Sequence, residues 1–168
     1  YLLEKDHGLS MPRRLQIEFS QVIQKIADES GKEISPSDIW ENFQETYLNE
    51  SGKYEFIKHN IKSSSNQDGT QSDKINIGIK DESKIIEMQG AGNGPIDAMI
   101  DAIKSDLKLD IKISDYHQHA ISSGSDAKAV AYSELILDDE SVWGVGIHQN
   151  TVIAGLLSVI SGLNRLSK

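Results

Sequence analysis

The sequence predicts an α+β fold, in which a tandem βββα duplication over residues 53–168 follows a small helical subdomain over residues 1–50. Apolar residues recur every three to four positions before about residue 50, which is typical of amphipathic helices, and alternate with polar residues after about residue 53, which is typical of half-buried strands. The order strand, strand, strand, helix then occurs twice. Each helix is expected to cover one face of its sheet, leaving the other face or an edge for the second unit or a partner chain.

Two helices are expected in the helical subdomain. The first has an apolar stripe over Leu15–Ile26 and ends at Gly31, a residue that commonly caps helix C-termini. The second begins at Ser35, whose side chain is suited to capping. Pro36 then fits the first turn, and Asp38 complements the positive end of the helix dipole.

The first βββα unit spans about residues 53–108 and begins with an alternating run from Tyr54. Isoleucines alternate strictly with polar or small residues over Ile75–Ile79, and Lys84–Met88 is the third predicted strand. The glycine-rich run Gly90–Pro95 then leads into an apolar helix.

The second unit spans about residues 109–168 and repeats this order. Strands are predicted over 109–121, 127–137 and 142–147, before a final helix that is rich in valine, isoleucine and leucine.

A shift of 56 residues superimposes the two units. It places Gly90 on Gly146 and Ala98 on Ala154, and the hydrophobic residues of the two helices stay in phase. Agreement in both element order and phase indicates an internal duplication.

Composition narrows the possible functions. The 168 residues can bury a full core without disulfides, and the absence of cysteine fits a reducing compartment and excludes thiol nucleophiles. A net charge of -9 disfavours nucleic-acid binding, and no apolar run approaches the roughly 20 residues of a membrane span.

We expect a cytoplasmic protein, or a mitochondrial one if the source is eukaryotic. Because the sequence starts with Tyr1 rather than Met, we also expect it to be cut from a longer chain.

The glycine-rich run has two interpretations. A strand, a flexible turn and the exposed N–H groups of a helix N-terminus together attract a carboxylate or phosphate. The spacing does not match a dinucleotide-binding or P-loop motif. The other interpretation is a tight connection in which the glycines supply positive φ angles.

Three alanines also point to either ligand binding or packing. Ala127, Ala129 and Ala131 alternate on one face of a predicted strand, where β-branched residues are more usual. Small residues there leave room for a ligand or let a helix pack closely. Together with the helix start, they fit a small apolar ligand with an anionic end, such as a free amino acid.

Other polar residues give no catalytic pattern. His117 and His119 face the same side of a strand as Asp115, but without a further fixed ligand a polar patch is favoured over a metal site. A charged cluster around the first helix is expected to form surface or inter-domain ion pairs, and its members are Asp6, His7, Arg13, Arg14 and Glu18. No catalytic residue and no metal ion are predicted for this chain.

Several stretches resemble the 2-isopropylmalate synthase family. Asp6–Ser20 is similar to the region after that family's catalytic barrel, and Gly92–Ala98 to its regulatory-domain signature. Shorter similarities cover Asp115–Tyr116, His119–Ala120, Gly124–Ala127, Ala131–Tyr132, Trp143–Ile147 and Asn164–Arg165. The resemblance therefore runs nearly from end to end.

The resemblance implies that the parent enzyme condenses acetyl-CoA with 2-oxoisovalerate in leucine biosynthesis. Its (β/α)8 barrel, with the divalent metal ion and the acetyl-CoA site, would lie N-terminal to this chain. Residues 1–50 would be a linker subdomain, and residues 53–168 a regulatory domain that forms a homodimer and binds L-leucine as feedback inhibitor. The fragment itself would need no cofactor.

The resemblance also implies a set of leucine contacts. The helix start would hold the ligand carboxylate, and the alanines would leave room for the isobutyl group. Gln118 departs from the family pattern, where Glu is usual, and Thr151 stands where an aliphatic residue is expected. The implied contacts are Gly92, Asn93, Gly94, Pro95, Ile96, Ile113, Tyr116, Ala120, Ala127 and Ala129.

Two other hypotheses stay open. The chain could belong to a citramalate-synthase-like enzyme, whose similar domain senses isoleucine, although the motif at residues 6–20 disfavours this. It could also be a purely structural dimerisation module that binds no ligand.

Overall fold

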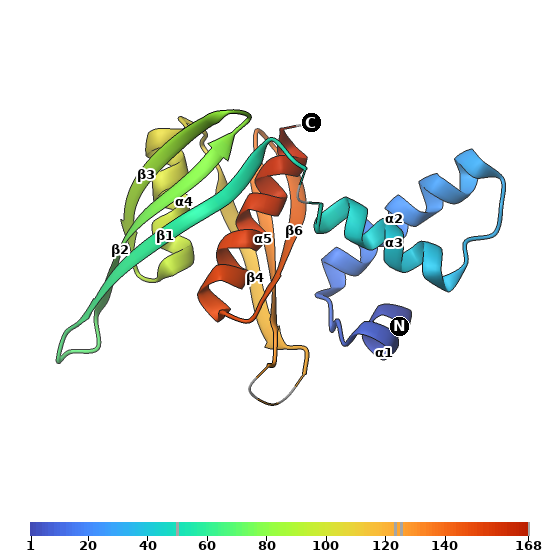
Figure 1. Cartoon of the computed structure of the whole chain (residues 1–168), viewed down its shortest axis with the longest axis horizontal. Helices are drawn as coiled ribbons and strands as arrows, with labels where there is room; N and C mark the ends of the chain where they lie inside the picture. The colour runs from blue at the N-terminus through green and yellow to red at the C-terminus, as the bar shows by residue number, and fades with distance from the viewer. Residues whose placement is uncertain (50, 123, 125, 168) are drawn as a thin grey trace.

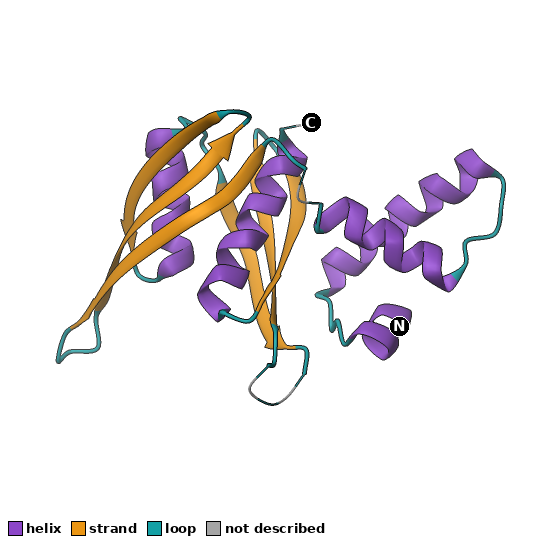
Figure 2. Cartoon of the chain, in the orientation of Figure 1, coloured by secondary structure: helices purple, strands orange, loops and turns teal. Residues whose placement is uncertain are grey.

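The computed structural model describes residues 1–49, 51–122, 124 and 126–167 (Figure 1). Glu50 and Lys168, which end the two predicted ranges, lie outside the described residues. The elements in chain order are α1 (Leu2–His7), α2 (Arg13–Ser30), α3 (Pro36–Tyr47), β1 (Tyr54–Ser65), β2 (Gln71–Asp81), β3 (Lys84–Gly92), α4 (Pro95–Asp106), β4 (Lys112–Ala120), β5 (Ala129–Leu137), β6 (Glu140–His148) and α5 (Thr151–Leu166). The predicted α+β fold with two βββα units is confirmed, and Figure 2 shows the N-terminal helices followed by the strand-rich part.

The helical unit, α1–α3, has the predicted helix ends. Ser35 Oγ accepts a hydrogen bond from the Asp38 N–H at 3.2 Å, and the Asp38 carboxylate accepts one from the Ser35 N–H at 3.1 Å. Gly31 ends α2 with φ 65° and donates to the Ala27 carbonyl. The sequence did not predict α1, because six residues are too few to show a helical period.

The strands form two separate antiparallel sheets. The first sheet has the order β1-β2-β3 and the second sheet β4-β5-β6, as expected for consecutive strands joined by short turns. Several predicted strand boundaries are wrong, among them the start of β6, which is Glu140 rather than Val142. β3 continues to Gly92, because this glycine still pairs with Asp73 of β2, and β4 begins only at Lys112. Ala127 precedes β5, because its N–H bonds to the Gly124 carbonyl within the loop.

The duplication is visible in how the helices lie on the sheets. α4 packs on β3 and β2, and α5 packs on β6 and β5 (Figure 1). A Cβ atom added to Gly90 would lie 2.5 Å from the Ala102 nitrogen, and one added to Gly146 would lie 2.6 Å from the Ser158 nitrogen. These pairs are 56 residues apart (146 − 90 and 158 − 102), so the offset found in the sequence superimposes equivalent contacts.

One of the two interpretations of the glycine-rich run, in which its glycines supply positive φ angles, is wrong. Gly90, Gly92 and Gly94 are absent from the glycines with positive φ, which are at positions 8, 31, 69 and 124. Positions 90 and 92 have no room for a larger residue, because the α4 backbone passes directly over them. Close helix-to-strand packing therefore explains these two glycines.

Both units share one hydrophobic core. It joins the inner face of the first sheet to α4 and α5, with Leu135 of the second sheet. Its buried residues include Ile75, Ile77, Ile79, Met88, Met99, Ile103, Leu156, Val159 and Leu163. The two units are consequently packed together around a single core.

The helical unit covers the other face of the second sheet. Leu9, Leu15 and Phe19 of this unit form a second buried cluster with Tyr132 and Trp143 of the sheet. The expected cover was the second unit or a partner chain, whereas the structure uses the N-terminal helices. In Figure 1 these helices lie beside β6 and away from the first sheet. No helix in the described part of the chain is long and apolar enough to cross a membrane.

We expect Gly146→Ala to lower the free energy of unfolding by about 1–3 kcal/mol, because the new methyl group overlaps the α5 backbone. Gly78→Ala is the matched control. Its Cβ would meet only the flexible Lys58 side chain, at 3.1 Å, so its unfolding free energy should change by less than about 1 kcal/mol. Urea unfolding of both variants measures the difference, and equal stabilities would contradict the close packing of α5.

Candidate functional site

The start of α4 has no side-chain cap. Gly94 occupies the N-cap position, and no side chain among the described residues bonds to the first N–H groups of this helix. At the equivalent position of α5, 56 residues later (150 − 94), Asn150 Oδ1 accepts a hydrogen bond from the Ile153 N–H at 3.0 Å. The first N–H groups of α4, including that of Ile96, are therefore oriented donors at the positive end of the helix dipole.

Three elements meet next to this helix start. A Cβ atom added to Gly155 of α5 would lie 2.7 Å from the Tyr116 Oη of β4 and 2.8 Å from the Ile96 Cδ1 of α4. We call the place where these three residues meet the junction. Burial raises the pKa of the Tyr116 phenol, so this hydroxyl stays protonated at neutral pH and can donate a hydrogen bond.

The alanines of β5 line the side of the junction. Ala129 and Ala131 are buried and pack against Ala154 of α5, with Tyr116 beside them. Ala131 is fully buried, so close packing of α5 accounts for its small size. Of the two interpretations that the sequence left open, packing therefore explains Ala131. Ala127 is half-buried in the loop before the strand.

The remaining predicted contacts lie at different distances from the junction. Gly92 ends β3, where a Cβ atom would lie 2.7 Å from the Asp97 side chain, and Asn93 after it is exposed. Ile113 packs against the shared core, and Ala120 is exposed at the end of β4. The structure thus brings Ile96, Tyr116, Ala129 and the open start of α4 together, and places Ile113 deeper and Ala120 nearer the surface.

Gln118 links β4 to the start of α5. Its Nε2 donates to the Thr151 carbonyl at 2.7 Å, and its Oε1 accepts from the Tyr116 hydroxyl at 3.3 Å. The two residues that depart from the family pattern therefore contact each other at the edge of the junction. The strand period puts Gln118 on the same face as Tyr116, but it gives no signal for the contact with Thr151.

A cavity of about 580 Å³ lies elsewhere, between α3, the start of β1, β6 and α5. Its wall includes Trp40, Tyr54, Phe56, Ile147 and Leu157. None of the ten predicted leucine contacts lines it. Its position at the edge of the helical unit separates it from the junction.

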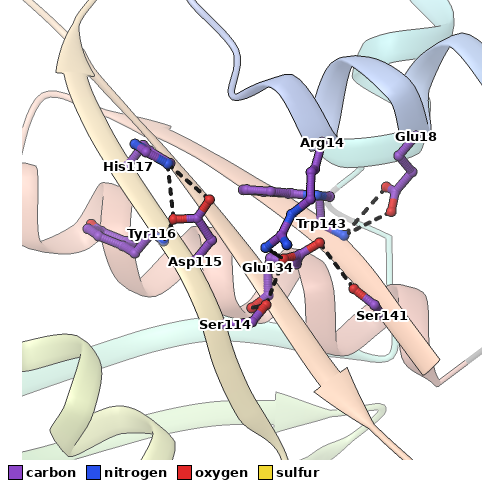
Figure 3. Close-up of polar contacts among 9 residues, drawn as sticks. All are labelled: Arg14, Glu18, Ser114, Asp115, Tyr116, His117, Glu134, Ser141 and Trp143. Atoms are coloured by element: carbon purple, nitrogen blue, oxygen red, sulfur yellow. Dashed lines mark hydrogen bonds and ion pairs between the residues drawn. The ribbon is translucent and has the colours of Figure 1, made fainter. Parts of the chain in front are cut away.

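The two histidines of β4 have different partners. The ring of His117 contacts the Asp115 carboxylate (Figure 3), with Nε2 at 3.0 and 3.1 Å from its two oxygens. The ring of His119 instead contacts the Tyr132 hydroxyl and the Ser10 backbone. Within the described residues, no three His, Asp or Glu side chains form a group that could hold a metal ion.

Ion pairs join the helical unit to the second βββα unit, which is the inter-domain kind of pairing that was one of the two expectations for this charged cluster. Glu18 of α2 pairs with Arg165 of α5, accepts from the Tyr47 hydroxyl at 2.9 Å and accepts from the Trp143 N–H at 3.2 Å. Burial, and next the Glu18 carboxylate, raise the pKa of Tyr47, which therefore stays a donor. Arg165 also donates to the Trp143 carbonyl at 2.7 Å. Glu18 thus connects both layers that flank the second sheet.

A second ion pair lies on the same interface. Arg14 of α2 pairs with Glu134 of β5, which is buried. Glu134 also accepts from the Ser114 hydroxyl at 2.7 Å and from the Ser141 hydroxyl at 3.2 Å (Figure 3). These bonds compensate the desolvation of the carboxylate, which a single exposed partner would not.

The fold and the junction define a class of protein, a duplicated βββα domain with a docked helical unit. The chain belongs to the LeuA allosteric (dimerisation) domain family, whose model matches residues 33–167. It is 40% identical to a 2-isopropylmalate synthase from Rhodospirillum rubrum over 99% of this chain and 30% of the relative. It is 42% identical to one from Mycobacterium ulcerans and 43% identical to one from Azoarcus sp., over 100% of this chain and 30% and 28% of those relatives.

These comparisons confirm the resemblance to the 2-isopropylmalate synthase family. The chain spans about 30% of the length of the curated relatives it matches. The family match begins within the helical unit, shortly before α3.

We expect Glu18→Gln to lower the free energy of unfolding by about 1–3 kcal/mol, because it leaves Arg165 without its anion in a largely buried interface. Glu87→Gln removes the partner of Lys58 in a surface pair at 3.0 Å, where both side chains are about two-thirds exposed. That control should lose no more than about 0.5 kcal/mol. Urea unfolding distinguishes the two, and an equal loss would show that the Glu18 contacts contribute little.

Proposed function

We propose that this chain is the linker subdomain (residues 1–50) and the allosteric regulatory domain (residues 53–168) of a 2-isopropylmalate synthase, and that it binds L-leucine as a feedback inhibitor. The main support for this proposal is the uncapped start of α4 beside the junction, in a chain that belongs to an allosteric domain family. The identities of 40–43% to 2-isopropylmalate synthases support the choice of parent enzyme.

The geometry suits the two ends of leucine. The ligand carboxylate accepts hydrogen bonds from the first N–H groups of α4, where the helix dipole favours an anion. The isobutyl group lies against the Ile96 side chain and the Tyr116 ring, with Ala129 beside them. The ligand ammonium needs acceptors, and the Gln118 Oε1 at the edge of the junction is one. The other contacts of the proposed site are Gly92, Asn93, Gly94, Pro95, Ile113, Ala120 and Ala127.

The parent enzyme, in this proposal, condenses acetyl-CoA with 2-oxoisovalerate in a barrel that precedes residue 1. The divalent metal ion and acetyl-CoA belong to that barrel. Dimerisation is part of the description of the matching family, which supports a homodimer built through this domain.

Calorimetric titration with leucine, isoleucine and valine tests the effector. We expect leucine to bind most tightly, because its branched end matches the apolar side of the junction. Preference for isoleucine would favour the citramalate-synthase-like alternative. A folded dimer in sedimentation whose melting temperature no amino acid shifts would favour a structural module.

We expect Gly94→Asp to weaken leucine binding at least about tenfold, which is about 1.4 kcal/mol. The new carboxylate caps α4 and repels the ligand carboxylate from the same N–H groups. Ser35→Asp is the control, because it adds the same charge at the N-cap of α3 and preserves the cap there. If Gly94→Asp binds leucine as tightly as Ser35→Asp, the carboxylate does not lie at α4.

The chain alone should release no CoA from acetyl-CoA and 2-oxoisovalerate, because the proposed catalytic barrel is outside it. A thiol-detecting assay, with an intact 2-isopropylmalate synthase as positive control, measures this. Turnover by the chain alone would contradict the assignment of catalysis to the barrel.

A further inference from the structure

Strands β4 and β5 have two faces with different partners. On one face, Tyr116, Ala129 and Ala131 form the side of the junction with α5. On the opposite face, Val130 and Tyr132 pack against the helical unit. Because successive residues of a strand point to opposite faces, the same strands form both contacts. A displacement of these strands therefore changes the contacts on both of their faces.

His119 connects three pieces of backbone and side chain at the end of β4. Its Nδ1 lies 3.0 Å from the Ala120 carbonyl, and its Nε2 lies 2.8 Å from the Tyr132 hydroxyl and 3.3 Å from the Ser10 nitrogen. A backbone N–H can only donate, so Nε2 must be the acceptor and Nδ1 carries the proton. Burial raises the pKa of the Tyr132 phenol, so its hydroxyl stays protonated and shares the one lone pair of Nε2 with the Ser10 N–H.

The three partners of His119 belong to different parts of the molecule. Ala120 is a proposed leucine contact, and Tyr132 directly follows Ala131 of the junction. Ser10 belongs to the segment between α1 and α2, in which Leu9 is 1% exposed within the cluster that docks the helical unit. The imidazole is therefore fixed between the proposed site and the helical unit.

We propose that His119 is a positioning residue that couples leucine binding at the junction to the Gly8–Ser10 segment of the helical unit. The inference rests on the proposed function, since it assigns the regulation of that same site. Leucine restrains the end of β4 through Tyr116 and Ala120, and the His119 ring transmits this restraint to the Ser10 amide. Both contacts of the ring along this route are hydrogen bonds to backbone atoms.

The strand contains a matched control. His117 lies two residues earlier on the same face of β4, but its ring pairs with Asp115 and makes no bond to the helical unit. Both side chains are imidazoles on one strand, so they differ chiefly in whether they reach Ser10.

Amide hydrogen exchange with and without leucine tests the coupling in the 168-residue chain. We expect leucine to slow exchange of the Leu9 and Ser10 amides at least threefold in the wild type and in His117→Ala. In His119→Ala this change should disappear, while calorimetric affinity for leucine stays within about threefold of wild type. His119→Gln should restore part of it, because an amide oxygen can accept from the Ser10 N–H.

The possible outcomes separate this inference from the proposed function. A wild-type chain that binds leucine without any change at Ser10, or a His119→Ala variant that keeps the full change, overturns the coupling alone. A wild-type chain that binds no leucine overturns both. If His119→Ala does not fold, Tyr132→Phe is tested in its place, because it keeps the aromatic ring of residue 132 but removes the hydroxyl that holds the His119 ring. Tyr132→Phe should then reduce the leucine-dependent slowing of amide exchange at Leu9 and Ser10, and an unchanged slowing would count against the coupling.

Discussion

Close contact between helix backbone and strand backbone is the constraint on which the rest of the structure depends. Gly90 brings α4 onto β3, and Gly146 brings α5 onto β6, with no room for a Cβ atom at either position. This contact sets the height of each helix above its sheet and hence the depth of the shared core. It also brings Gly155 of α5 against Ile96 and Tyr116, so that the junction between the units is a consequence of the same packing.

The second sheet is unusual in this molecule because both of its faces are covered. α5 covers one face, and the helical unit covers the other through a large apolar cluster with charged groups at its margin. Arg14 anchors α2 to this sheet through Glu134, and Glu18 does so through the Trp143 N–H while pairing with Arg165 of α5. A buried, two-sided sheet is well suited to carry a change from one face to the other, because neither face can relax into solvent. The first sheet instead exposes its outer face, which carries Lys62, Lys74 and the exposed Ile85.

Much of the fold could be predicted from local signals. Alternating isoleucines in β2, the Ser35 capping box and the terminal Gly31 are properties of short stretches, and the structure has all three. The 56-residue offset could be found in the sequence because close helix packing requires a glycine at the same position of each unit. The short α1 and the cover of the second sheet were not readable, since the first is too short for a period and the second is a long-range contact. Interpretation of the glycines as positive-φ residues failed because sequence alone does not distinguish a tight turn from a tight contact.

The candidate site was only partly predictable from the residues themselves. Glycines before a helix indicated an anion-binding start, and the structure leaves that start without a side-chain cap. The alanines were ambiguous, and packing against Ala154 explains Ala131. The contact between Gln118 and Thr151 depends on how two elements 33 residues apart meet, so no local pattern could indicate it.

A duplicated fold begins with two equivalent helix starts, and the two in this chain have diverged. Asn150 closes one with its own side chain, whereas Gly94 leaves the other open. The internal repetition is therefore broken at these positions, because the first N–H groups of α5 are already partly satisfied by a side chain of the chain itself and those of α4 are not. The two units also differ in their neighbours. The uncapped helix start belongs to the first unit, and the sheet that contacts the helical unit belongs to the second.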